Sequence, residues 1–197
     1  MPFGHLIAPL GYSMALSQCP SSRLAFFSGL CLAGDGDGPA AAARLLPHAR
    51  VVAVEASPYM IIVGQRQNED VLSRNLSWVH ALAEDTGLAS SSADVVTICL
   101  LFHECSDEAK RAIGHEAFRI LRPGGVLVLT DTPQQDLHTY RGFYEPHKDA
   151  WTRFEAESFF TAVGFVNPLY CGMIQGEGEG TDNRLWTWTC QKPVAKL

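Results

Sequence analysis

Hydrophobic and polar positions alternate along the chain in blocks that predict strands and helices in turn. Residues 50–55 form a continuous β-branched run, RVVAVE, which is typical of a strand covered on both faces. Short apolar runs at 24–33, 76–82, 93–102 and 126–132 have the same character, and the first of them ends in glycines. The pattern therefore predicts at least five buried strands before residue 133.

Helices are predicted between these strands, at 39–46, 57–75, 106–121 and 149–165. A proline in the first turn opens each of the first two, and a serine caps the second and the third. The third helix shows the clearest apolar face, and RPGG ends it. The residues of that face are Ala109, Ile113, Ala117, Ile120 and Leu121.

Two strands close the chain, at 169–174 and 184–190, with the glycine and glutamate loop 175–183 between them. Because no helix separates them, they form an antiparallel hairpin at one edge of the sheet, and Trp186 and Trp188 share one face of it. The predicted fold class is α/β: a doubly wound, mostly parallel, seven-stranded Rossmann-like sheet with a C-terminal antiparallel hairpin strand.

Composition narrows the class of protein. The chain has 197 residues, 47% of them hydrophobic and 18% charged, which suits one globular domain. A net charge of −6 argues against duplex nucleic acid as a partner, and no apolar run reaches the ~18–20 residues of a membrane span. The six cysteines form no CxxC pair, which indicates a reducing compartment without a disulfide framework.

Three segments are expected along the chain. Residues 1–23 form a leader, which is either a targeting segment or a loosely ordered extension, since no acidic residue occurs before Asp35. Residues 24–192 form the domain, and 193–197 are a tail. We predict a cytoplasmic location, with a plastid or mitochondrion as the alternative if the leader is a transit segment.

The glycine cluster GDGDG at 34–38 is either a plain surface turn or the cradle of a ligand. Glu55 favours the cradle, because the 17 positions from Gly38 to Glu55 accommodate a helix, a turn and a strand. The carboxylate then lies at the strand tip beside the glycines, where it can accept the hydroxyl protons of a ribose. Pro39 stands where the dinucleotide-binding pattern needs its last glycine, and the aspartates of the cluster suit a cationic or zwitterionic ligand.

Four motifs in this order resemble the class I S-adenosylmethionine (SAM)-dependent methyltransferases, in particular the UbiE-like small-molecule methyltransferases. They are GDGDG, VVAVEASPYM, the segment VHALAEDTGLASSSADVVTICLLFHE and the segment EAFRILRPGGVLVLTDT. The resemblance covers about residues 29–190. It implies SAM as the cofactor and a small molecule as the methyl acceptor.

The resemblance also implies roles for individual residues. The glycines would wrap the methionine part of SAM, Glu55 would hold the ribose, and Met60 with residues 82–84 would border the adenine. Residues 100–103 would face the sulfonium. Leucines occupy positions 32 and 82, where the family usually has acidic residues. The complete predicted cofactor-binding set is Gly34, Asp35, Gly36, Gly38, Glu55, Ala56, Met60, Leu82, Ala83, Glu84 and Leu100.

Candidate acceptor residues follow the fourth and fifth strands. His103 is either a general base or a polar strand-end residue bonded to the backbone, and Asp131 is either a base or an acceptor for loop amides. Tyr140, Tyr144 and His147 either line the acceptor pocket or belong to an amphipathic flap. No metal is expected, because Asp107 stands where the zinc-protease pattern that begins at His103 needs its second histidine.

Two hypotheses of different classes follow. The first is an enzyme that transfers the methyl group of SAM to an oxygen, nitrogen or carbon of a small molecule. The alternative is a degenerate methyltransferase-like domain that serves as a non-catalytic interaction module. A nicotinamide-dependent oxidoreductase ranks third, because the last glycine of its motif is misplaced.

Overall fold

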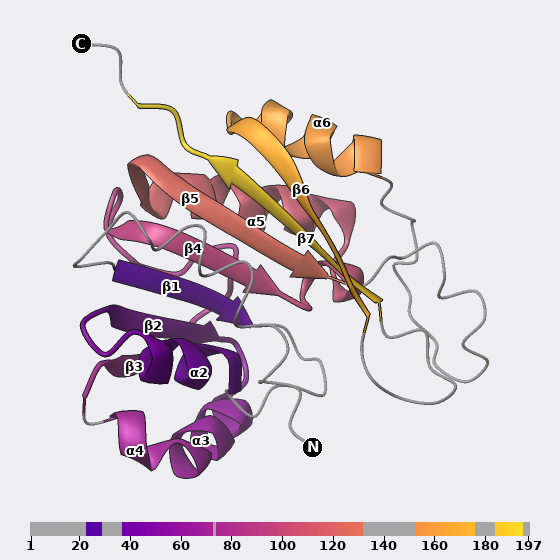
Figure 1. The fold of residues 1–197 in the computed structure, drawn as a ribbon. Coiled ribbons are helices and arrows are strands. Elements are labelled where there is room, and N and C mark those ends of the chain that lie inside the picture. The colour runs from indigo at the N-terminus through magenta and orange to yellow at the C-terminus, as the bar shows by residue number, and fades with distance from the viewer. Residues whose placement is uncertain (1–22, 29–36, 73, 132–152, 176–183, 195–197) are drawn as a thin grey trace, which may run out of the picture.

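The computed structural model describes residues 23–28, 37–72, 74–131, 153–175 and 184–194. Strands and helices alternate through these residues as the hydrophobic pattern predicts (Figure 1). The elements are β1 (Arg23–Ser28), α2 (Asp37–Leu45), β2 (Arg50–Glu55), α3 (Pro58–Gln67), α4 (Glu69–Leu72), β3 (Leu76–His80), β4 (Ala93–Cys99), the 3₁₀ helix η1 (Phe102–Glu104), α5 (Asp107–Ile120), β5 (Leu121–Asp131), α6 (Arg153–Val163), β6 (Val166–Gln175) and β7 (Arg184–Gln191).

The strands form one seven-stranded sheet in the order β3-β2-β1-β4-β5-β7-β6. The strands from β3 to β5 pair in parallel, whereas β7 pairs antiparallel with both β5 and β6. The winding therefore reverses between β1 and β4, and the last hairpin closes one edge. This architecture confirms the predicted doubly wound sheet with its C-terminal hairpin.

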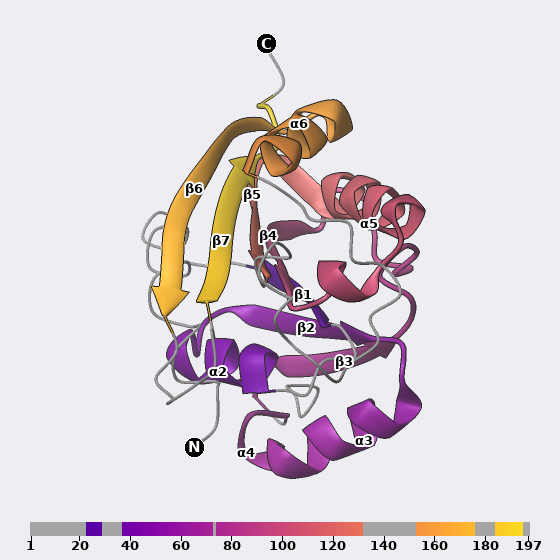
Figure 2. The ribbon, with the colours of Figure 1, turned by 90° about the vertical axis from the view of Figure 1, so that its right-hand side faces the viewer.

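Helices cover both faces of the sheet, as the edge-on view shows (Figure 2). On one face, the alanines of α2 and Val71 of α4 pack against Val51, Ala53 and Val95. On the other face, α5 and α6 pack against alternate residues of the central strands, among them Val96 and Ile98. Because strand side chains alternate between faces, a β-branched run such as 50–55 supplies both cores at once.

The predicted helix at 57–75 is two helices. Ser57 caps α3 through its Oγ, which accepts the amide of Met60, as expected. The helix then ends at Gln67, and the side-chain amide of its C-cap residue Asn68 donates to the carbonyl of Gly64 at 2.9 Å. Arg44 of α2 donates to the Asn68 Oδ1 at 2.9 Å, so a contact between helices fixes the break.

Three element boundaries also differ from the prediction. β4 ends at Cys99 instead of residue 102, and α2 begins at Asp37, before Pro39. β5 begins at Leu121 and includes the RPGG segment expected to be a turn. The RPGG segment belongs to β5 because its glycines pair with the residue after β7. The carbonyl of Gly125 accepts the amide of Lys192, and the carbonyl of Lys192 accepts the amide of Gly124, both at 2.9 Å.

β1 covers the first part of the apolar run at 24–33, and the rest of that run lies outside the described residues. Trp188 of β7 is buried in the core, and its ring lies 5.1 Å from that of Tyr170, which supports a packing role. The four cysteines that the structure describes, 99, 105, 171 and 190, are not in disulfides. Among the described residues, no helix is long and apolar enough to cross a bilayer.

Candidate active site

The carboxyl ends of the central strands meet at the point where the winding of the sheet reverses. Glu55 lies opposite His80 in β3, and Cys99 lies between Ser28 of β1 and Thr130 of β5. In open α/β sheets this edge is where ligands bind, because the loops diverge there and leave space above the strands. The predicted cofactor residues that the structure describes follow these strand ends.

Glu55 is the last residue of β2, as the spacing of the motif predicts, and its side chain is 3% exposed. Its Oε1 accepts the backbone amide of Ser57 at 2.8 Å, and its backbone carbonyl accepts the amide of Ala81 at 3.2 Å. The residue is therefore held from α3 on one side and from the loop after β3 on the other. A buried carboxylate with a fixed orientation suits the diol of a ribose.

Ala56 and Met60 lie beside Glu55. Ala56 is exposed, and its carbonyl oxygen lies 3.0 Å from the Nε2 of His80, which joins β3 to the turn after β2. Met60 lies in the first turn of α3 and is half-buried. An apolar side chain one turn from the carboxylate is suitably placed to border a flat apolar ligand.

The loop from β3 to β4 carries the predicted adenine edge. Leu82 and Asp85 form an isolated antiparallel bridge that closes a tight turn, with Ala83 and Glu84 at its centre. The Leu82 side chain is 59% exposed, whereas Ala83 is half-buried against the core under α5. The turn thus presents an apolar edge next to Glu55.

Residues 99–104 turn sharply at the end of β4. Leu100 has a φ of +50°, a conformation that costs a non-glycine residue energy and clusters at functional sites, and its amide donates to the Thr130 carbonyl at 2.9 Å. The amide of Phe102 donates to the buried Asp131 Oδ2 at 2.8 Å. Of the two interpretations of Asp131, the structure shows the acceptor for a loop amide. His103 lies in η1, directly after this turn.

Lys110 was not singled out by the sequence analysis, although it lies on the same helical face as Ile113 and Ala117. Its side chain is 1% exposed and pairs with Asp107 at 3.3 Å, close to the start of α5. The signal that could have revealed it is a lysine at apolar spacing. Nearby, burial first and then Glu84 raise the pKa of the Cys105 thiol to about 11, so this cysteine is a poor nucleophile.

Several predicted site residues lie outside the described residues: Gly34, Asp35, Gly36, Tyr140, Tyr144 and His147. Gly38 is described, as the second residue of α2, and a Cβ built on it meets no atom within 4 Å. In the described ranges, no group of three His, Cys, Asp or Glu side chains could hold a metal ion.

Comparison with known proteins identifies the family. The family described as "Methyltransferase domain" matches residues 31–129, from the glycine cluster to β5. The chain belongs to this family. It is a class I SAM-dependent methyltransferase domain, as the four motifs predict, and S-adenosylmethionine is its cofactor.

Two curated relatives share part of this domain. A mitochondrial 2-methoxy-6-polyprenyl-1,4-benzoquinol methylase of Caenorhabditis elegans is 31% identical over 101 residues, which are 50% of this chain and 35% of that protein. A demethylmenaquinone methyltransferase of Oceanobacillus iheyensis is 27% identical over 95 residues, 48% of this chain and 39% of that protein. The matched segment thus spans less than half the length of either relative.

Solved structures support the fold. An arsenic(III) SAM methyltransferase of Chlamydomonas reinhardtii superimposes with a TM-score of 0.63 at 20% identity. The superposition covers 89% of this chain and 64% of that one. At this identity the likeness concerns the Rossmann-like methyltransferase architecture.

Proposed function

We propose that this methyltransferase binds SAM at the carboxyl edge of β1, β2 and β4 and transfers its methyl group to a small-molecule acceptor. The observation that carries the proposal is Glu55, a buried carboxylate oriented by the Ser57 amide at the tip of β2. It lies beside the turn 82–85, to which the Ala81 amide connects it and whose Leu82 and Ala83 supply an apolar edge. A nucleoside needs this combination of a diol acceptor and an apolar edge.

Each part of the site has a proposed role in holding the cofactor. Glu55 accepts the hydroxyl protons of the ribose, and Met60 and Ala83 border the adenine. Leu100 bends the backbone at the end of β4, so that residues 100–103 face the reacting atoms. The remaining members of the predicted set, Gly34, Asp35, Gly36, Gly38, Ala56, Leu82 and Glu84, are proposed to complete the site.

When bound, SAM supplies a methyl carbon that its sulfonium already activates for displacement. The chain's own residues would hold the acceptor nucleophile in line with that carbon and would take up the proton that the acceptor releases. Catalysis of such an in-line displacement comes mainly from alignment of the reactants and exclusion of water. His103 is the proposed base for the proton, and Tyr140, Tyr144 and His147 are the proposed acceptor-side residues.

The names of the curated relatives suggest which acceptors to test first. One relative is named for a benzoquinol and the other for demethylmenaquinone, so we propose hydroxylated aromatic rings as the first acceptor class. A cytoplasmic location remains our prediction, with an organelle as the alternative because one relative is named as mitochondrial.

Transfer of radiolabelled methyl from SAM tests the proposal. The purified chain is incubated with labelled SAM and a panel of benzoquinols, naphthoquinols, phenols and amines, and product formation is compared with that of the Glu55→Ala variant. We expect labelled product with at least one acceptor, and roughly ten- to hundredfold less with the variant at an equal SAM concentration below the Kd of the unmodified protein. Binding of SAM in calorimetry without transfer to any acceptor would favour the non-catalytic alternative. If the chain gives neither binding heat nor methyl transfer at millimolar SAM, the proposal is refuted.

A further inference from the structure

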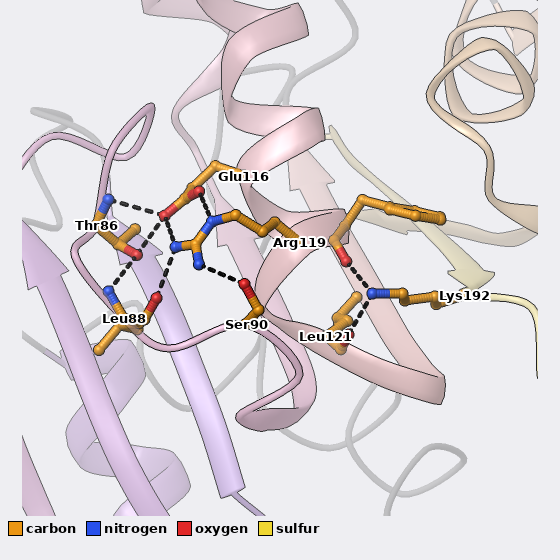
Figure 3. Close-up of polar contacts among 8 residues, drawn as sticks. Thr86, Leu88, Ser90, Glu116, Arg119, Leu121 and Lys192 are labelled. Carbon is orange, nitrogen blue, oxygen red and sulfur yellow. Dashed lines mark hydrogen bonds and ion pairs between the residues drawn. The ribbon is translucent and has the colours of Figure 1, made fainter.

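Two residues of α5 tie the loop between β3 and β4 to the body of the domain (Figure 3). Glu116 accepts the backbone amide of Thr86 at 2.9 Å and its hydroxyl at 2.5 Å, both through Oε1. Arg119 donates to the carbonyl of Leu88 at 2.7 Å and to the hydroxyl of Ser90 at 3.0 Å. The loop is thus fastened at three successive points, 86, 88 and 90.

The two side chains also fix each other. Arg119 Nε lies 2.7 Å from Glu116 Oε2, and Nη2 lies 2.7 Å from Oε1. The two side chains thus form a bidentate ion pair, which is among the stronger side-chain contacts. Glu116 and Thr86 are both buried. The Arg119 bonds first, and then those from Thr86, lower the pKa of Glu116 to about 2, so the carboxylate stays charged throughout the physiological range.

The tie begins one residue after the proposed adenine edge. At its N-terminal end, the turn 82–85 follows Ala81, whose amide is bonded to the carbonyl of Glu55. At its C-terminal end, the turn is followed directly by Thr86, whose amide donates to Glu116. Leu82 is largely exposed and supplies little packing of its own. The Leu82–Asp85 bridge closes the turn, and the two anchors with the packing of Ala83 hold it in place relative to Glu55.

We propose that Glu116 and Arg119 are positioning residues for the cofactor, which hold the turn 82–85 in the shape that receives the adenine ring. The inference rests on the proposed function, since it assumes that SAM binds at this turn. Its physical basis is preorganisation: apparent affinity falls in proportion to the fraction of molecules whose turn is already formed. If that fraction falls to about one tenth, Kd rises about tenfold.

A purely structural role for the pair would give a different pattern, and Lys192 supplies the matched control. Its Nζ donates to the carbonyls of Phe118 and Leu121 at 2.7 Å each, so it supports the same C-terminal end of α5 from the side away from the loop (Figure 3). Lys192→Met removes two hydrogen bonds from the same helix, away from the loop. Loss of general helix support would weaken SAM binding equally in both kinds of variant.

The experiment uses the full chain with Glu116→Gln, Glu116→Ala, Thr86→Val and Lys192→Met. Thermal unfolding sets a temperature at which every variant is folded, and calorimetry then gives the Kd for SAM and for 5′-methylthioadenosine, which lacks the amino-acid part. We expect Kd for both ligands to rise about tenfold in Glu116→Ala, with smaller rises in Glu116→Gln and Thr86→Val. Lys192→Met should stay within about twofold of the unmodified protein.

Hydrogen exchange supplies a readout that needs no ligand. The amides of Thr86, Leu88 and Ser91 are all bonded within this network, so the peptide 82–92 should exchange faster in the Glu116 and Thr86 variants and at the normal rate in Lys192→Met.

Equal SAM affinity in the unmodified protein and Glu116→Ala would overturn the inference, as would an equal loss in Lys192→Met. A loss for SAM that methylthioadenosine does not share would also overturn it, because the adenine end would then be unaffected. If the unmodified chain binds neither ligand, the proposed function fails together with the inference. If the unmodified protein binds SAM and the Glu116 and Thr86 variants bind it with the same Kd, only the inference is refuted and the proposed function stands.

Discussion

Replacement of Glu55 is the sharpest test of where the cofactor lies. In Glu55→Gln the side chain keeps its shape, and its amide oxygen can still accept the Ser57 amide that Oε1 now accepts at 2.8 Å. The change removes the negative charge at a buried position beside the proposed ribose. The free energy of unfolding should thus change little, whereas the ribose hydroxyls lose the charged acceptor to which they would donate.

The expected magnitude follows from that contact. Hydrogen bonds to a charged acceptor are worth about 1.5–3 kcal/mol, so Kd for SAM should rise roughly ten- to hundredfold in Glu55→Gln and Glu55→Ala. Glu55→Ala also leaves the Ser57 amide without its partner at the start of α3, which should lower the free energy of unfolding by about 0.5–2 kcal/mol. The two variants therefore share the binding loss and differ in stability.

Calorimetry with SAM and urea unfolding measure the two effects separately. Glu69→Gln, which changes an exposed carboxylate of α4, is the control and should leave both quantities unchanged. An unaltered Kd in both Glu55 variants would mean that the ribose is held elsewhere, and the assignment of the site to the tip of β2 would be wrong.

Four further predictions concern other described residues. Gly38→Ala should leave the melting temperature unchanged or higher, because the new Cβ meets no atom within 4 Å, yet it should weaken SAM binding if the glycines form a cradle. Gly125→Ala should lower the free energy of unfolding by about 1–3 kcal/mol in urea titrations, because its Cβ would lie 2.9 Å from a backbone oxygen. The lowered pKa of Glu116, about 2, means that its ion pair stabilises the fold fully above about pH 4.5 and less as pH falls toward 2. The stability gap between the unmodified protein and Glu116→Gln, about 2–3 kcal/mol at pH 7 once screening is allowed for, should therefore narrow over that acid range, and a constant gap would contradict the assignment. Finally, peptide mapping after brief alkylation at pH 8 should show Cys171, which is exposed, labelled before Cys105, whose pKa is raised to about 11.

Local features of the fold could be predicted because their causes are local in sequence. The β-branched run of β2 must be covered on both faces, and the cap at Ser106 starts α5 where its Oγ accepts the Ala109 amide at 3.2 Å. The placement of Glu55 also follows from spacing alone, since the length of one helix and one strand fixes how far along the chain the next strand tip occurs. Neither conclusion needs knowledge of distant contacts.

Other features depend on residues far apart in the chain. The break at Asn68 requires Arg44 from α2, and β5 extends back to Leu121 because the residues after β7 pair with its glycines. The sequence alone left two roles open for Asp131. Its carboxylate proved to accept an amide 29 positions away, which no local pattern reveals.

The sequence by itself determined the family, the cofactor and the order of the elements, because the motifs are short and each acts through its own backbone. Only the tertiary structure decided how the loop after β3 is held. Glu116 and Arg119 are visible in the sequence as an i,i+3 pair on a helix, a pattern that usually indicates a solvated ion pair. Thr86, the partner of Glu116, lies 30 positions away, and the two meet only because β3 and β4 lie on opposite sides of β1 and β2, so that the connecting loop crosses the face of the sheet that α5 covers.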